Sequence, residues 1–186
     1  MSLHPHETTG ALALGSRAPA FDLPGVDDRR HSLDDYADAA ALALVQSCNH
    51  CPYVIAWEPR MNAIQRDYAE RGVRLVAVSS NDAERYPADS FEEMKKRGAE
   101  REFAFDYLYD EEQTLARTLG SERTPEVFLF DGDRRLVYHG AIDDNREEAS
   151  VSRHWLREAL DAVLEGRAPA VAETPPVGCS VKYRDR

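Results

Sequence analysis

The segment ALALVQSCNHCPYV, residues 41–54, combines a strand pattern with a close pair of cysteines. Residues 41–46 form a largely apolar run of strand length, which is typical of a strand buried on both faces. Cys48 and Cys51 follow directly, two residues apart, with His50 between them. This spacing suits metal binding, a structural role or electron transfer, so the surrounding sequence must decide among the three.

The composition of the whole chain narrows the class of protein. It has 186 residues, 42% hydrophobic and 31% charged, as in a soluble globular protein of one domain. A net charge of −11 disfavours nucleic acid or an anionic membrane as partner, because both require clustered Lys and Arg. No export signal or membrane-spanning run is recognised. Three cysteines fit a reducing compartment, so we expect a cytoplasmic protein whose close pair is catalytic or metal-binding.

A helix is expected directly after the cysteine pair. Apolar residues recur there at steps of three and four, which places them on one helical face: Val54, Trp57, Met61, Ile64 and Tyr68. Pro59 should kink this helix and Gly72 should end it. Residues 73–80 read as a second buried strand, so strand, helix and strand form a parallel, right-handed crossover unit.

The remaining sequence predicts an α/β fold, a central mixed sheet with helices on both faces. Residues 12–40 are expected to form short strands or a hairpin against the main domain. A helix at residues 89–98 is expected to be capped by Asp89 or Ser90. Further expected elements are a strand at 103–109, a helix at 111–120, a hairpin of 127–130 with 136–139, and a last helix closed by Gly166.

The domain organisation follows from these elements. Residues 1–11 are expected to be a flexible leader, and residues 12–166 to form one domain. The proline-rich segment 167–186 is expected to be a C-terminal tail that carries Cys179. No internal repeat or second domain is recognised.

The position of the cysteine pair predicts a reactive thiol. Reactive groups gather beyond the carboxyl ends of strands in an open α/β sheet, and Cys48 is expected there, at the start of a helix. The free N–H groups and partial positive charge of a helix N-terminus favour a thiolate, and a protonated His50 adds a charge of the same sign. We therefore expect a lowered pKa for Cys48, which makes it the nucleophile. Cys51, one turn inside the helix and more buried, would be the resolving thiol.

The element order, the C-x-x-C after the first core strand and the Thr124-Pro125 dipeptide together resemble the thioredoxin superfamily, over roughly residues 14–166. The resemblance implies a cis bond at Pro125 beside the cysteines and a groove in which the Thr124 backbone pairs with an extended substrate. LALGSRAPAFDLPGVDDRRHSL, residues 12–33, is similar to the lead-in of the redoxin branch, which includes the AhpC/TSA peroxiredoxins. The helix and strand between residues 89 and 109 match the insertion of that branch.

Two positions depart from the patterns of these relatives. Peroxiredoxins have Pro and Thr just before their peroxidatic cysteine, whereas this chain has LALVQSC, which weakens a peroxidase interpretation. Leu42 stands where thioredoxins have a buried Asp, so proton transfer with Cys51 must use another group or water. The C-x-H-C form resembles disulfide oxidases and isomerases, in which the histidine makes the pair less reducing.

These features predict a thiol–disulfide oxidoreductase, an antioxidant redoxin of cell redox homeostasis. Cys48 attacks a protein or small-molecule disulfide, Cys51 resolves the mixed disulfide, His50 tunes Cys48, and Thr124 with Pro125 shapes the groove. No cofactor is expected, and a dithiol protein would supply electrons. Two alternatives stay open: a thiol peroxidase in which Cys48 becomes a sulfenic acid, and a non-enzymatic binding module.

The third cysteine and a metal site complete the hypotheses. Zinc prefers four ligands, so His50 and Cys179 would have to join Cys48 and Cys51, and we expect no metal. Cys179 is either a tail cysteine without function or an auxiliary thiol. In the second case Gly178 lets the tail turn back, so that Cys179 approaches the active site and acts as a second resolving thiol.

Overall fold

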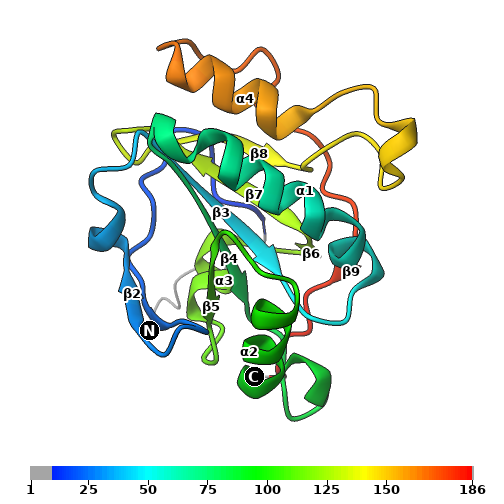
Figure 1. Cartoon of the computed structure of the whole chain (residues 1–186). Helices are drawn as coiled ribbons and strands as arrows, with labels where there is room; N and C mark the ends of the chain where they lie inside the picture. The colour runs from blue at the N-terminus through cyan, green and yellow to red at the C-terminus, as the bar shows by residue number, and fades with distance from the viewer. Residues whose placement is uncertain (1–9, 186) are drawn as a thin grey trace, which may run out of the picture.

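The computed structural model describes residues 10–185, and its centre is a five-stranded mixed sheet (Figure 1). The strand order is β5-β4-β3-β7-β8. β3 is parallel to β4, and β4 to β5, whereas β7 is antiparallel to both β3 and β8. The strands are β3 (Ala41–Ser47), β4 (Val73–Ser79), β5 (Asp106–Tyr109), β7 (Glu126–Phe130) and β8 (Leu136–Gly140). The predicted crossover unit and hairpin are therefore confirmed.

Elements cover both faces of this sheet. One face carries α1 (Pro52–Tyr68), α2 (Phe91–Glu100) and α4 (Trp155–Leu164), and the other carries α3 (Thr114–Leu119) and the hairpin of β1 (Asp22–Pro24) and β2 (Arg30–Ser32). The central strand β3 explains this division, because alternate side chains of a strand point to opposite faces. Ala43 and Val45 contribute to the core under α1, whereas Leu42 and Leu44 contribute to the core under the hairpin.

The helix after the cysteines is longer than its apolar stripe. α1 begins at Pro52, which suits a first helical position, and runs to Tyr68 with Pro59 inside it. Trp57 is 1% exposed and packs in the core, as expected. The 3-10 turn η2 (Ala69–Arg71) follows, and Gly72 ends it in a left-handed conformation.

The predicted helix at 111–120 is shorter in the structure because it starts later. Gln113 adopts a left-handed backbone conformation directly before α3. The buried carboxylate of Asp110 accepts hydrogen bonds from the N–H groups of Leu115 and Ala116, so it satisfies donors of the first turn. The polar start of this segment is thus a loop that turns around Asp110.

The C-terminal segment is packed along the domain. It passes beside β8, where His139 N donates to Ala172 O and Thr174 N donates to His139 O. It ends in β9 (Cys179–Ser180), which pairs with β6 (Arg123–Thr124), as the red end of the chain in Figure 1 shows. Two further 3-10 turns, η3 (Pro87–Asp89) and η4 (Glu148–Ser150), and η1 (Leu33–Tyr36) complete the fold.

Most of the expected leader, residues 1–9, lies outside the residues that the structure describes. The first described residues pack against the end of α3. Leu12 N donates to Leu119 O, and Gly10 lies against Gly120. Among residues 10–185, no helix combines the length and apolar character needed to span a membrane.

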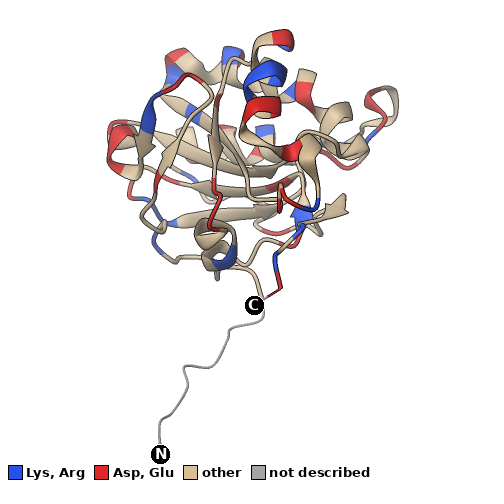
Figure 2. Cartoon of the chain, turned by 90° about the horizontal axis from the view of Figure 1, so that it is seen from below, with Lys and Arg blue, Asp and Glu red and all other residues tan. Residues whose placement is uncertain are grey.

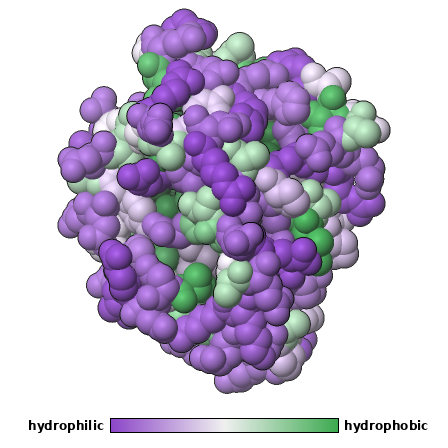
Figure 3. Space-filling view, in the orientation of Figure 1, coloured by the Kyte–Doolittle hydropathy of each residue, from purple (hydrophilic) through white to green (hydrophobic). Residues whose placement is uncertain are grey.

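The surface is mixed in charge and mainly hydrophilic. Lys and Arg are interspersed with Asp and Glu over the molecule in Figure 2. The face in Figure 3 is largely hydrophilic, with apolar residues in small separate groups.

Candidate active site

The two close cysteines lie where β3 gives way to α1. Cys48 follows the last residue of β3, and Cys51 is the N-cap of α1. The expectation that Cys51 lies one turn inside the helix is wrong, because the helix begins only at Pro52. Cys48 is 1% exposed and Cys51 0% exposed, so the expected difference in burial between them is also absent. Both are free thiols.

Thr124, at the end of β6, contacts both sulfurs. Its peptide bond to Pro125 is cis, which confirms the expectation from the resemblance. Cys48 Sγ lies 3.7 Å from Thr124 Oγ1, and Cys51 Sγ lies 3.3 Å from the Thr124 carbonyl oxygen. Thr124 is completely buried, so it closes the site opposite the helix.

The pKa of Cys51 is lowered and that of Cys48 is raised, which is the reverse of the expected order. A hydrogen bond from Cys48 lowers the pKa of Cys51 to about 4, against the effect of burial, and Cys179, Thr124 and the Val54 N–H add to the lowering. The same hydrogen bond, together with burial and the charge of Asp89, raises the pKa of Cys48 far above its usual range. The two thiols titrate as a pair, which loses its first proton readily and holds the second. The predicted low pKa of Cys48 is wrong.

Asp89 supplies a buried carboxylate to the site. Ser90, not Asp89, caps α2, since Ser90 Oγ accepts the N–H of Glu93. Asp89 is fully buried and accepts hydrogen bonds from Asn49 N at 2.7 Å and Asn81 Nδ2 at 2.8 Å. Because residue 42 is a leucine, β3 contributes no acidic side chain to the site at that position. The inserted segment before α2 contributes Asp89 instead.

His50 pairs with that carboxylate. Its Nδ1 lies 2.6 Å from Asp89 Oδ2, and its ring stacks on Tyr86 at 5.9 Å between centroids. The His50 side chain is 34% exposed, so water screens its charge. Asp89, with which His50 pairs, is the carboxylate whose charge raises the pKa of Cys48.

In the described part of the chain, three side chains at this site lie close enough together to bind one metal ion. Cys48, His50 and Asp89 each offer one ligand atom, all within 4.8 Å of one another. Zinc sites of the structural kind have four ligands, and this group has three. Cys179, considered above as a ligand, lies instead against Cys51.

Cys179 completes the site from the C-terminal segment. β9 places it directly opposite Thr124 in the register with β6, and it packs against the Cys48–Cys51–Val54 cluster. A Cβ on Gly178 would lie 1.9 Å from the Thr124 carbonyl oxygen, so only glycine permits this approach. The predicted return of the tail through Gly178 is confirmed.

The predicted substrate groove is occupied by this strand. The Thr124 backbone was expected to pair with an extended substrate, and in the structure it pairs with Cys179 of the same chain. Sequence reasoning missed this because β9 is two residues long and carries no strand signal of its own.

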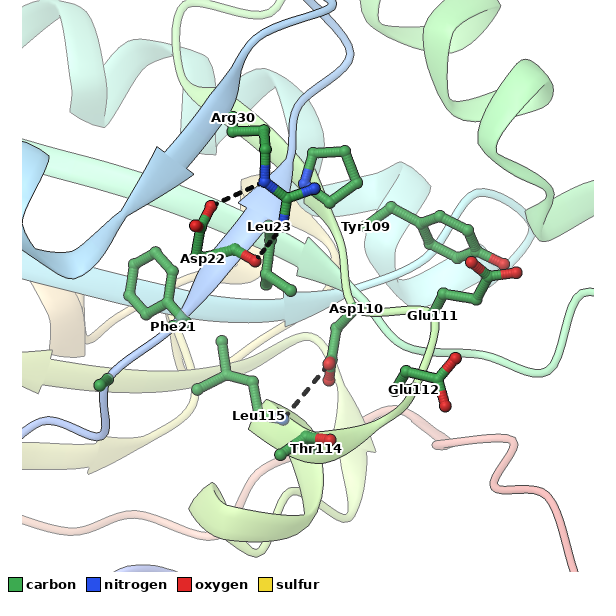
Figure 4. Close-up of a pocket in the computed structure, with 12 residues that line it drawn as sticks. Phe21, Asp22, Leu23, Arg30, Tyr109, Asp110, Glu111, Glu112, Thr114 and Leu115 are labelled. Atoms are coloured by element: carbon green, nitrogen blue, oxygen red, sulfur yellow. Dashed lines mark hydrogen bonds and ion pairs between the residues drawn. The ribbon is translucent and has the colours of Figure 1, made fainter.

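A separate cavity lies away from the cysteines (Figure 4). It has a volume of about 490 Å³ and lies between the β1–β2 hairpin and the loop from β5 to α3. Arg30 pairs with Asp22 at its rim, and Asp110 holds the start of α3, so these three side chains already have partners. No cysteine lines it.

The mixed sheet, the cysteine pair at the start of the first long helix and the cis proline beside it define a thioredoxin-like protein. Within that class, residues 14–139 match the AhpC/TSA family. The match covers more than half of the chain, which therefore belongs to this family.

Similar proteins agree with this placement. A hypothetical protein from Sinorhizobium meliloti 1021 has a structure with TM-score 0.89 and 35% identity, covering 94% of this chain and 97% of that one. An uncharacterized conserved protein from Geobacillus kaustophilus has TM-score 0.89, 40% identity and 94% coverage of both chains. The thiol-disulfide oxidoreductase ResA of Geobacillus thermodenitrificans (strain NG80-2) is 26% identical over 128 residues, 68% of each chain.

Proposed function

We propose that the protein is a thiol–disulfide oxidoreductase in which Cys48 and Cys51 form a reversible dithiol–disulfide couple. The observation that carries this proposal is the packing of two free, buried sulfurs against each other where β3 gives way to α1, with both in contact with Thr124 before the cis proline. A thiolate at neutral pH is the reactive form in disulfide exchange. The similarity to ResA supports the same class of reaction.

The difference in acidity suits the two sulfurs to separate roles. As Cys48 attacks a substrate disulfide, its proton passes to the Cys51 thiolate, so the partner acts as the base. The first substrate thiolate leaves and takes that proton. Cys51, again ionised, attacks the Cys48 sulfur of the mixed disulfide and expels the second substrate thiolate. The low pKa of Cys51 suits it to this resolving step.

A second reaction, reduction of hydroperoxides, is favoured by one observation. Cys48 is 1% exposed beneath Thr124 and β9, a setting that a small oxidant enters more easily than a protein disulfide. Attack of Cys48 on the peroxide oxygen releases an alcohol or water and leaves a sulfenic acid, and Cys51 condenses with it to form the disulfide and water. Either substrate leaves the same Cys48–Cys51 disulfide, which a dithiol protein of a reducing compartment would reduce.

The experiment that tests the function uses the Cys179→Ser variant, which isolates the pair. Equilibration in dithiothreitol redox buffers, followed by peptide mass spectrometry, should show one two-electron couple between Cys48 and Cys51. Consumption of oxidised glutathione, insulin disulfide and hydrogen peroxide is then compared under the same conditions. Failure of the two sulfurs to join defeats the proposal, and a marked preference for peroxide assigns the peroxidase reaction instead.

A further inference from the structure

We propose that Cys179 is the thiol through which electrons enter this site. The disulfide formed between Cys48 and Cys51 passes to Cys51 and Cys179, where a dithiol partner reduces it. This inference rests on the proposed function and adds to it a third redox residue and the place where the partner acts.

Accessibility is the first argument. Cys48 is 1% exposed and Cys51 0% exposed, whereas Cys179 is partly exposed. Cys179 also packs against the cluster of Cys48, Cys51 and Val54, and β9 holds it opposite Thr124, which contacts both sulfurs. An external thiol therefore meets Cys179 first, and Cys179 meets Cys51.

The second argument is that the strand carrying Cys179 is fixed. Backbone pairing at Thr124 is continued by a hydrogen bond from Val181 N to Glu122 O at 3.0 Å. Lys182 is held on both sides: its N–H donates to Asn81 Oδ1 at 2.8 Å, and its carbonyl oxygen accepts from Asp82 N at 2.8 Å. Val181 between them is buried. Held in this way, Cys179 is an intramolecular reactant with a high effective concentration at Cys51.

The third argument is that oxidation of the pair prepares Cys179 for attack. In the reduced site, burial and the hydrogen bond and charge of Cys51 raise the pKa of Cys179 to about 11, while Lys182 and Arg123 act in the opposite direction. When Cys51 joins a disulfide, its negative charge disappears and the two cations remain. Cys179 then ionises more easily, at the moment when a disulfide is available to it.

The transfer balances in atoms and electrons. Cys179 gives up its proton and attacks Cys51 Sγ. The Cys51–Cys179 bond forms as the Cys48–Cys51 bond breaks. Cys48 leaves as the thiolate and takes up a proton. A thiolate of the partner then attacks Cys179 Sγ and expels Cys51, whose low pKa makes it the best leaving group of the three. The second thiol of the partner attacks the mixed disulfide, releases Cys179 and leaves the partner oxidised.

The same strand restricts the partner. Because β9 occupies the backbone edge of β6 at Thr124, an extended polypeptide has no free edge to pair with there. The partner must therefore place one thiolate on Cys179 from outside.

The first test is trapping. In Cys48→Ser, one equivalent of diamide should link Cys51 to Cys179 within a monomer, as peptide mass spectrometry would show. Cys48→Ala, checked for folding by circular dichroism, repeats the measurement without the serine hydroxyl. Absence of the Cys51–Cys179 disulfide in a folded variant overturns the inference.

The second test is kinetic, with dithiothreitol as the dithiol probe. The oxidised wild-type protein should be reduced at least about tenfold faster than oxidised Cys179→Ser, because the remaining sulfurs of the variant are buried. Ser180→Ala, the neighbouring residue of β9, is the matched control and should keep the wild-type rate. Equal rates for wild type and Cys179→Ser overturn the inference but leave the proposed function intact, whereas absence of the Cys48–Cys51 disulfide from Cys179→Ser defeats the proposed function.

Discussion

The surroundings of Cys48 and Cys51 differ more than their places in a four-residue motif suggest. Cys48 faces Asp89 and a buried network of hydrogen bonds, and its pKa is raised. Cys51 caps α1, contacts Cys179 and has a pKa lowered to about 4 by its hydrogen bond from Cys48. Only two residues of chain thus separate a sulfur beside a carboxylate from a sulfur at the positive end of a helix.

This difference shows that order in the sequence does not decide which cysteine is ionised. The helix begins at Pro52, so the helix N-terminus acts on Cys51 more directly than on Cys48. The carboxylate of Asp89 acts on Cys48 and opposes ionisation there. The following predictions test how the two sulfurs differ and what shields them.

The largest effect is expected from Cys51→Ser. It should abolish the thiolate present at neutral pH and end turnover through the Cys48–Cys51 disulfide, because burial and the charge of Asp89 still oppose ionisation of Cys48 and its partner sulfur is gone. Ultraviolet absorbance of the thiolate during a pH titration measures the first effect. Cys179→Ser is the matched control and should retain the neutral-pH thiolate. A thiolate that persists in Cys51→Ser would place it on Cys48.

Gly178→Ala should expose the pair. The new Cβ would lie 1.9 Å from the Thr124 carbonyl oxygen, so β9 must move away. We expect alkylation of Cys48 and Cys51 by iodoacetamide to become at least about tenfold faster and unfolding to cost about 1–3 kcal/mol less. Gly10→Ala, where an added Cβ meets nothing within 4 Å, serves as control. Unchanged alkylation would mean that β9 does not shield the sulfurs.

Asp89→Asn should lower the pKa of Cys48 by about one unit, since it removes a buried negative charge beside the thiol. The thiolate absorbance of the double variant Cys51→Ser, Cys179→Ser reports this group alone. Glu92→Gln, an exposed residue of α2, should leave the titration unchanged. If Asp89→Asn behaves like Glu92→Gln, the acidity of Cys48 is set by burial alone.

At neutral pH, the redox midpoint should change with pH half as steeply as that of two ordinary thiols. Above the Cys51 pKa of about 4, reduction of the disulfide yields one thiolate and one thiol, so two electrons bring one proton. The midpoint should therefore fall by about 30 mV per pH unit at neutral pH and about twice as steeply below the Cys51 pKa. Redox titration of Cys179→Ser across this range is the measurement, and a steep slope at neutral pH would contradict a lowered Cys51 pKa.

The smallest effect is expected from His50→Gln. His50 is 34% side-chain exposed and pairs with Asp89, so its charge is screened and shared. The pKa of Cys48 should change by less than about half a unit. A larger change in the same titration would show that His50 acts on Cys48 directly.

The parts of this molecule that follow local patterns could be predicted from the sequence. The apolar run of β3, the stripe of α1 and the Asp-Gly hairpin depend on neighbours a few residues away, and each was located within a few residues. The position of Cys48 after β3 followed from the same patterns. The cis bond before Pro125 followed from the resemblance to the thioredoxin superfamily.

The rest depended on contacts between distant residues. Asp89 and Ser90 were equally good caps on sequence grounds, and the hydrogen bond of Asp89 to Asn49, 40 residues away, decides between them. The course of the tail depends on Lys182 and Asn81, which are 101 residues apart. Such pairs leave no periodic signal, which is why the partner of His50 and the cover over Thr124 were missed.

The pairing of β9 with β6 also links oxidation to the unfolding of the whole domain. A bond between Cys51 and Cys179 would close a loop of roughly 130 residues, for which chain entropy predicts a stabilisation of about 5 kcal/mol. A bond between Cys48 and Cys51 closes a loop of only a few residues and constrains the unfolded chain little. Two oxidised forms with the same composition would then melt at different temperatures, and calorimetry could tell which sulfurs are joined.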